Sequence, residues 1–181
     1  MRIVAGEHRG RVLKTVAGPN IRPTSDKVRQ AIFNALQHRG AVENAVVLDA
    51  FCGTGALALE AYSQGAKACI FMDMAPESLQ LAQDNAALLK ALRFSSFINK
   101  DATRPGLRPA LIQPANLIFL DPPYHKNLIP QALTALQEYS WVAENCFIVA
   151  EAEKAANLNE LPGEIVFDKT YRDTRVVISK T

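Results

Sequence analysis

The amino-acid sequence predicts an α/β fold: a mostly parallel sheet with helices on both faces and an antiparallel hairpin at one edge. Three observations predict it. From residue 46 onward, short apolar segments alternate with helix-like segments, and a glycine-containing turn follows the first of them. This order is typical of Rossmann-like βαβ units. Residues 164–180 then alternate apolar and polar side chains around a polar turn, as hairpins do.

The composition is that of an ordinary globular protein. The chain has 181 residues, of which 49% are hydrophobic and 21% charged, and this length encloses the core of one domain. No apolar run approaches the roughly 20 residues that cross a membrane, and the start resembles no signal peptide. We therefore expect a soluble, cytoplasmic protein with no membrane partner. A monomer is expected, although nothing in the sequence specifies the oligomeric state.

The three cysteines form no CxxC pair, and their number is odd. A disulfide framework or a zinc site is therefore not expected, and we predict no bound metal. Cys69 and Cys146 lie in apolar, strand-like segments, where free cysteines are usually small core residues.

Charge divides the chain into two parts. Residues 1–40 hold eight basic and two acidic residues, a net charge of +6, whereas residues 41–181 hold twelve basic and sixteen acidic residues, a net charge of −4. We predict an N-terminal extension over the first range and the main domain over the second. A basic extension favours a polyanionic partner, although charge alone is equally compatible with a solvated face.

The extension is predicted to contain a hairpin and a helix. Residues 2–5 and 11–16 have the pattern of two strands joined by a polar turn. Thr24 or Ser25 can cap the helix, whose apolar side chains recur at every fourth position to about residue 40. The basic side chains of the hairpin are the candidate contacts for such a polyanion: Arg2, Arg9, Arg11 and Lys14.

Strands and helices alternate in the main domain. The expected strands are residues 46–49, 68–73, 95–99, 117–120 and 146–150, followed by the hairpin strands 164–170 and 174–180. The expected helices are residues 56–64, 77–90 and 128–138.

A cofactor site is predicted at the carboxyl ends of these strands, where such sheets bind ligands. Gly53 and Gly55 let the loop after the first strand approach a ligand closely, and the next helix begins with free N–H groups. Asp49 can stabilise an ammonium group directly or through water. Asp73 is placed to accept from ribose hydroxyls, and Asp101 from an adenine amino group.

The glycine loop by itself also fits NAD binding, but an acid directly before it favours S-adenosylmethionine. A purely structural turn with Asp49 capping the helix is the alternative. Asp73 and Asp101 can likewise be solvated strand ends. Cys52 is interpreted as a small residue tolerated in the loop, since no general-base partner for a thiol nucleophile is evident.

The candidate catalytic segment is Asp121-Pro122-Pro123-Tyr124, directly after the strand that ends at Leu120. Consecutive prolines fix an extended backbone. The Asp121 carboxylate and the Pro122 carbonyl can accept from the two hydrogens of an exocyclic base amine and free its lone pair for methylation. Tyr124 would stack on the base.

Other interpretations of this segment stay open. A rigid strand exit with Tyr124 as packing is the structural alternative, and His125 is a competing general base. The same segment serves adenine-N6 as well as guanine-N2 methylation.

Four segments together resemble the RsmD family, bacterial methyltransferases that act on guanine N2 of small-subunit rRNA. They are residues 2–11 (RIVAGEHRGR), 22–29 (RPTSDKVR), 48–57 (LDAFCGTGAL) and 121–124 (DPPY). The sequence departs from the family at three positions: Cys52 stands where alanine is usual, His8 where tryptophan is common, and Arg172 where glycine is usual.

The resemblance implies a seven-stranded class I methyltransferase sheet, an N-terminal hairpin that helps to grip RNA, and 16S rRNA or an assembling small subunit as partner. It also places Arg22, Pro23 and Thr24 near the cofactor. The S-adenosylmethionine-binding residues are then expected to be Arg22, Thr24, Asp49, Phe51, Cys52, Gly53, Thr54, Gly55, Asp73, Met74, Asp101 and Ala102.

Other function classes stay open at this point. An adenine-N6 methyltransferase is the nearest enzyme, and a protein-glutamine methyltransferase usually has asparagine in place of Asp121. A non-catalytic RNA-binding scaffold would not need an intact Asp121 and glycine loop. An NAD oxidoreductase would bind NADH and not S-adenosylhomocysteine.

Overall fold

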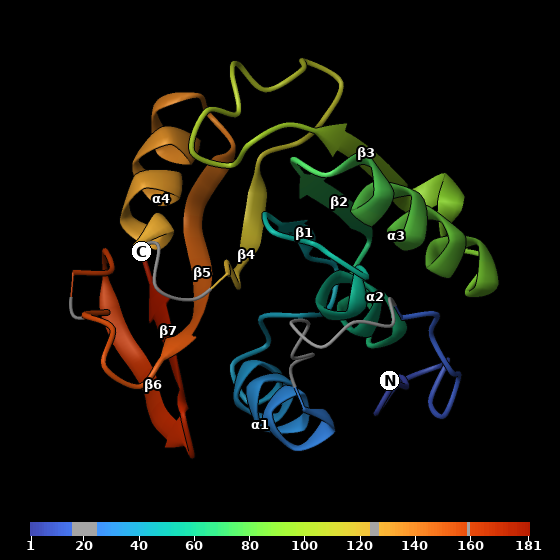
Figure 1. The fold of residues 1–181 in the computed structure, drawn as a ribbon, viewed down its shortest axis with the longest axis horizontal. Coiled ribbons are helices and arrows are strands. Elements are labelled where there is room, and N and C mark those ends of the chain that lie inside the picture. The colour runs from blue at the N-terminus through green and yellow to red at the C-terminus, as the bar shows by residue number, and fades with distance from the viewer. Residues whose placement is uncertain (16–24, 124–126, 159) are drawn as a thin grey trace.

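A computed structural model describes residues 1–15, 25–123, 127–158 and 160–181. It contains one seven-stranded sheet in the order β3-β2-β1-β4-β5-β7-β6 (Figure 1). The first five strands of this order are parallel, β7 is antiparallel to β5, and β6 is antiparallel to β7. The strands are β1 Val46–Asp49, β2 Ala68–Asp73, β3 Ser95–Asn99, β4 Ala115–Leu120, β5 Val142–Glu153, β6 Glu164–Tyr171 and β7 Thr174–Lys180.

Helices cover both faces of the sheet. They are α1 Asp26–Gln37, α2 Ala56–Ser63, α3 Pro76–Leu88 and α4 Leu128–Glu138, with a short 3₁₀ turn, η1, at Leu92–Phe94. Buried side chains of α1, α2 and α3 belong to one hydrophobic cluster, and those of α4 belong to the other. The predicted doubly wound α/β architecture is therefore confirmed.

The central strands are apolar throughout because both of their faces are covered. All four residues of β1 are buried, as are the last four of β4, which is the pattern expected of parallel strands between helices. Helix α1 begins where the sequence indicated: the Ser25 side chain accepts from the Val28 N–H at 3.3 Å and so caps the first turn.

The connection from β3 to β4 holds no helix. Residues 100–114 cross the sheet as a loop that is anchored near the end of α4. The Trp141 indole N–H donates to the Gly106 carbonyl at 2.8 Å, and Arg108 Nε donates to the Ser140 carbonyl at 2.6 Å. Trp141 is buried, so its only polar atom is satisfied by the loop that covers it.

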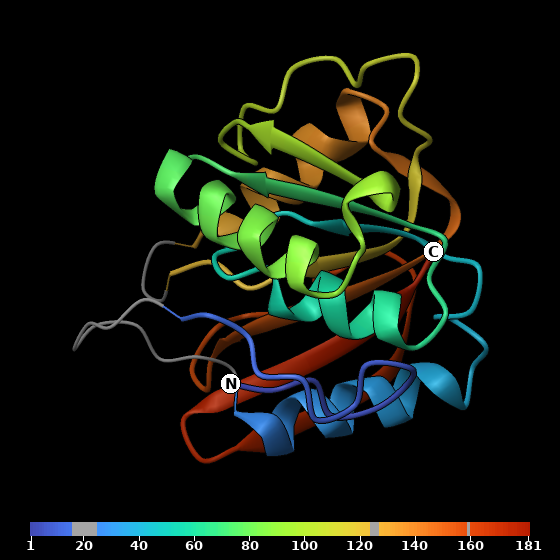
Figure 2. The same cartoon turned by 90° about the vertical axis from the view of Figure 1, so that its right-hand side faces the viewer.

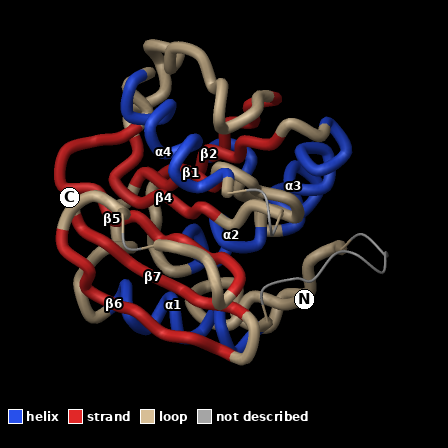
Figure 3. Tube along the Cα trace, turned by 60° about the vertical axis from the view of Figure 1, so that its left-hand side comes forward, coloured by secondary structure: helices blue, strands red, loops and turns tan. Residues whose placement is uncertain are grey.

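The terminal hairpin agrees with the prediction, and β5 is longer than predicted. Strand β7 pairs with β5 as far as Glu153, so backbone pairing extends β5 beyond its apolar centre. Arg172, in the hairpin turn, has φ 53°, the conformation that glycine adopts most easily. Figure 3 shows the hairpin continuing the sheet beyond β5.

The N-terminal hairpin is less regular than predicted. Arg2 and Val12 form one isolated antiparallel bridge, and the arm, residues 1–15, contains no strand. The backbone pairing of the hairpin stops because the Val4 and Ala5 N–H groups donate to the side chain of Glu60 on α2, at 2.8 and 2.9 Å. The arm lies between α1 and α2 (Figure 2).

Ile3 and Leu13 of the arm belong to the same hydrophobic cluster as α1, α2 and α3, so the arm shares the core of the main sheet. In the described ranges, no helix is both long and apolar enough to cross a membrane.

Candidate active site at the carboxyl edge of the sheet

The parallel strands bring the predicted acids to one edge of the sheet. Asp49 ends β1 and Asp73 ends β2, while Asp101 and Asp121 follow the ends of β3 and β4. The chain connects β1 to β2 on one side, and β4 lies on the other side of β1. This is the switch point at which doubly wound sheets open a crevice for ligands.

The glycine loop is tied to both neighbouring strands. The Ala50 N–H donates to the Phe119 carbonyl of β4 at 3.1 Å, and the Cys52 N–H donates to the Met72 carbonyl of β2 at 3.0 Å. The loop is therefore fixed before any ligand arrives.

Glycine stands at two positions of this loop for different reasons. Gly55 has φ 75°, and a Cβ there would meet the Phe71 ring at 2.9 Å, so close packing of α2 on β2 requires glycine. Gly53 has φ 50°, and a Cβ there would meet nothing within 4 Å. At Gly53 the loop backbone faces open space, which leaves room for a ligand.

Asp49 is a buried acid beside two other acids. Its side chain is 1% exposed and accepts from the Ala58 N–H of α2 at 3.3 Å. The pKa of Asp49 is raised to about 8: burial raises it most, the Ala58 hydrogen bond lowers it, and the nearby Asp121 and Asp73 raise it. A cation placed here would relieve both the desolvation and the repulsion.

Asp73 holds the glycine loop in place and is half-buried. One carboxylate oxygen accepts from the Gly53 N–H and the other from the Ala75 N–H, both at 2.9 Å. Each oxygen keeps a free lone pair, so a hydroxyl can still be bound. The Asn99 side chain donates to the Asp73 and Met74 carbonyls at 3.0 and 3.1 Å, which fixes the turn from the side of β3.

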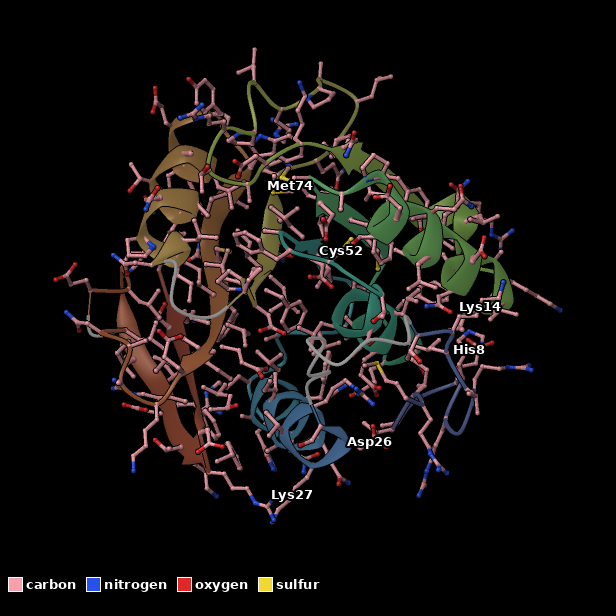
Figure 4. The ribbon with its side chains drawn as sticks, in the orientation of Figure 1. His8, Lys14, Asp26, Lys27, Cys52 and Met74 are labelled. Carbon is pink, nitrogen blue, oxygen red and sulfur yellow. The ribbon has the colours of Figure 1, made fainter. Side chains whose placement is uncertain are left out.

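The other predicted cofactor residues differ in how far they are buried. Asp101 accepts from the Thr103 N–H and hydroxyl at 2.9 and 2.8 Å. Ala102 and Cys52 are buried, Phe51 and Thr54 are half-buried, and Met74 is 71% exposed. Cys52 and Met74 are labelled in Figure 4. Burial raises the pKa of the Cys52 thiol far above its usual range, which agrees with an unreactive loop residue.

The candidate catalytic segment begins at the end of β4, the strand next to β1. Asp121 is half-buried, Pro122 is buried and Pro123 is exposed. Phe119 of β4 pairs with Asp49 of β1, which places Asp121 two residues beyond the level of Asp49. Tyr124 and His125, and likewise Arg22, Pro23 and Thr24, lie outside the described residues.

Sequence reasoning missed the polar contacts that dock the arm. Glu60 of α2 is fully buried, and its oxygen lies 3.4 Å from Arg29 Nε of α1, which is 1% exposed. Arg29 also donates to the Arg2 carbonyl at 2.5 Å and to Asp26 at 2.8 Å. The signal available in the sequence was a lone acid in the apolar helix ALALEAYS.

Asn85 of α3 links the arm to the glycine loop. Its side chain accepts from the Lys14 N–H at 2.7 Å and donates to the carbonyls of Lys14 and Thr54, at 3.0 and 2.9 Å. The Thr54 hydroxyl also contacts the Met1 sulfur at 3.8 Å. One end of the arm therefore borders the glycine loop, through a buried amide that the sequence did not single out.

The four candidate RNA contacts are not equivalent. Arg9 and Arg11 are exposed at the tip of the arm. Arg2 lies 4.0 Å from Asp26, and Lys14 Nζ donates to Asp84 at 2.8 Å. The tip rests on Ser63, at the carboxyl end of α2, whereas Lys14 lies near its amino end. The arm thus carries positive charge away from the crevice along the length of α2.

Comparison with known proteins gives one consistent result. The sequence profile of a family described as "Conserved hypothetical protein 95" matches residues 1–180. The ribosomal RNA small subunit methyltransferase D of Escherichia coli K12 is 33% identical over 90% of this chain and 79% of its own length. The protein YlbH of Bacillus subtilis, provisionally named an rRNA methyltransferase, is 37% identical over 99% of this chain and 98% of its own.

Solved structures have the same fold. The Escherichia coli protein yhhF, provisionally named a methyltransferase, superposes with a TM-score of 0.83 at 30% identity, covering 99% of this chain and 97% of its own. An RNA methyltransferase of Salinibacter ruber, solved with S-adenosyl-L-homocysteine, has a TM-score of 0.63 at 17% identity, covering 88% of this chain and 93% of its own. The second likeness concerns the fold alone.

Proposed function

Because this chain belongs to the RsmD family, whose profile spans residues 1–180, we propose that it transfers a methyl group from S-adenosylmethionine to the exocyclic N2 of a guanine in 16S rRNA. The observation that carries this proposal is the position of Asp121-Pro122 at the switch point, one strand away from the buried Asp49. The hydrogen-bond acceptors for the base amine and the carboxylate for the cofactor's ammonium group would then border the same crevice.

The residues of the crevice fit the cofactor. Asp49 offers a buried carboxylate to its ammonium group, Asp73 has free lone pairs for ribose hydroxyls, and the backbone at Gly53 faces open space. Asp101 is proposed for the adenine, and Met74, Ala102, Phe51, Cys52, Thr54 and Gly55 for the walls. When bound, the cofactor supplies an electrophilic methyl group on a sulfonium.

The chain's own contribution to the reaction is hydrogen bonding and alignment. The Asp121 carboxylate and the Pro122 carbonyl accept from the two amine hydrogens, so that the nitrogen lone pair leaves conjugation with the ring. Tyr124 is proposed to stack on the base. The nitrogen–carbon bond forms as the carbon–sulfur bond breaks, and the nitrogen then releases a proton to water. Holding the reacting atoms in line provides the remaining rate enhancement.

The target base is tested in cells. Nucleosides from the rRNA of a strain that lacks the gene are expected to lose N2-methylguanosine in mass spectrometry, and the gene supplied in trans should restore it. Loss of N6-methyladenosine in its place would establish the adenine alternative. Assays on naked 16S rRNA, assembling subunits and DNA then identify the substrate form.

Cofactor binding is expected to depend on pH through Asp49. A carboxyl with its pKa raised to about 8 is mostly protonated at pH 6, whereas the cofactor's ammonium group favours the ionised form. Affinity should therefore increase about tenfold from pH 6 to pH 7 and level off above pH 8. Calorimetry in buffers of different ionisation enthalpy should detect proton release on binding below pH 8.

The control for this prediction is Asp49→Asn, which cannot titrate. It should bind S-adenosylhomocysteine more weakly and with little dependence on pH. An unchanged pH profile in this variant would show that another group titrates.

RNA binding is expected to involve the tip of the arm. Replacing Arg9 and Arg11 by glutamine should weaken 16S rRNA binding and make its salt dependence shallower, by a slope of about 0.7 to 0.9 per lost phosphate contact. The matched control is Lys154→Gln together with Lys169→Gln, two cations near the terminal hairpin. An unchanged slope in the arm variant would remove Arg9 and Arg11 from the RNA site.

A further inference from the structure

A row of neighbouring side chains links the tip of the arm to α2 and η1. The His8 and Tyr62 rings are stacked, with centroids 5.6 Å apart and planes 14° apart. Tyr62 and Phe94 follow at 5.7 Å and 35°, and the Arg93 guanidinium carbon lies 4.6 Å from the Phe94 centroid. We call these four residues the aromatic ladder. Its three rings are half-buried and Arg93 is exposed, so its ends reach the surface.

The arm tip is held firmly against α2, which fixes the first ring of the ladder. The Glu7 N–H donates to the Ser63 carbonyl at 2.8 Å, and the His8 N–H donates to the Ser63 hydroxyl at 2.9 Å. A Cβ at Gly6 would lie 1.8 Å from the Ser63 carbonyl oxygen, so only glycine permits this contact. A ring fixed in advance loses little conformational freedom when a ligand stacks on it.

Positive charge surrounds the aromatic ladder. Arg9 and Arg11 follow His8 in the arm, and Arg93 lies at the other end of the ladder. Lys67 lies two residues before Cys69 of β2, which pairs with Ser95 next to Phe94. In the described part of the chain, none of these four cations has a carboxylate partner within 4 Å. Glu7 is the acid that lies near Tyr62.

We propose that the aromatic ladder is a second RNA-contact site, where an unpaired base of the substrate stacks on the outer face of His8 while neighbouring phosphates meet Arg9, Arg11, Arg93 and Lys67. The proposal rests on the proposed function, because it assumes an RNA substrate. Aromatic faces among unpaired cations are the chemistry that recognises single-stranded nucleic acid. An acidic peptide would contact the cations, but its carboxylates would not require the exposed ring face.

This site is distinct from the crevice. Helix α2 has eight residues, a rise of about 12 Å, with the glycine loop at its amino end and the ladder at its carboxyl end. In Figure 4, α2 lies between Cys52 and His8. That separation corresponds to about three or four stacked nucleotides at 3.4 Å each. The base on His8 is therefore not the methylated one, and the substrate must extend well beyond its target nucleotide.

The test is a set of substitutions at residue 8, measured by binding to 16S rRNA and by methyl transfer. His8→Ala should weaken RNA binding about five- to a hundredfold, the range for removing one base-stacking ring, with kcat at saturating RNA and cofactor affinity unchanged. The salt slope should also stay unchanged, since stacking releases no counterions. His8→Phe, which keeps a ring, should restore most of the affinity.

His38→Ala, at the exposed end of α1, is the matched control and should bind RNA like the native protein. If His8→Ala binds 16S rRNA as tightly as the native protein and has an unchanged unfolding midpoint, the inference is overturned. The surface would then be assigned to a protein ligand. Equal losses in His8→Ala and His8→Phe would also overturn it. Failure of the native protein to methylate rRNA would instead overturn the proposed function, so the two failures are distinguishable.

Discussion

Replacing Asp121 by alanine is expected to lower the rate of methyl transfer by about 10²- to 10³-fold or more, the usual effect of removing one preorganised polar group from a reacting centre. Under the proposed mechanism, alanine leaves the amine with one acceptor in place of two. Cofactor affinity should change by no more than a few fold. Asp121 raises the pKa of Asp49, so its removal favours the ionised Asp49 that the cofactor needs.

Single-turnover methylation of 16S rRNA measures the rate, and calorimetry with S-adenosylhomocysteine measures cofactor binding. Asp121→Asn should retain part of the activity, because its amide oxygen still accepts one hydrogen bond. Asp168→Ala, on the outer strand β6, is the matched control and should turn over normally. A parallel loss of rate and cofactor affinity in Asp121→Ala would indicate that the residue is structural.

Replacing Glu60 by alanine is expected to lower the free energy of unfolding by about 3 to 5 kcal/mol, the usual cost of breaking a buried ion pair from one side. The fully buried carboxylate accepts from the N–H groups of Val4 and Ala5 and lies 3.4 Å from Arg29 Nε. Without it, the buried guanidinium loses its buried counter-charge and the arm loses two hydrogen bonds. The arm should separate from α2.

Urea unfolding measures the loss, and proteolysis of the arm reports its release. Glu60→Gln should cost less, because an amide oxygen still accepts from the arm. The double variant Glu60→Ala with Arg29→Met should cost less than the sum of the two single variants, since the two charges are coupled. Strict additivity would show that the two side chains act independently.

Much of the fold follows from local patterns. Buried parallel strands have continuous apolar runs and helices have their own period, so each predicted strand from 46–49 to 174–180 is confirmed. The Asp49–Gly55 segment indicated a turn at the carboxyl end of a strand, and Ser25 indicated a helix start. These are properties of a few consecutive residues.

The N-terminal hairpin shows what local sequence patterns do not predict. Residues 2–5 alternate as a strand would, yet two of their N–H groups donate to Glu60, which lies about 55 positions away in the sequence. No local pattern specifies that partner. The same holds for Asn85, which joins Lys14 to Thr54.

The sequence by itself determined the order of strands and helices, the glycine loop and the acids that follow the strands, because periodicity and turn chemistry act over short stretches of chain. Only the tertiary structure decided that Asp49 is buried beside Asp73 and Asp121, that Glu60 and Arg29 fasten the arm, and that the rings of His8, Tyr62 and Phe94 lie in a row. Burial, pKa and stacking depend on distances between residues far apart in the chain, and packing of the whole domain sets those distances.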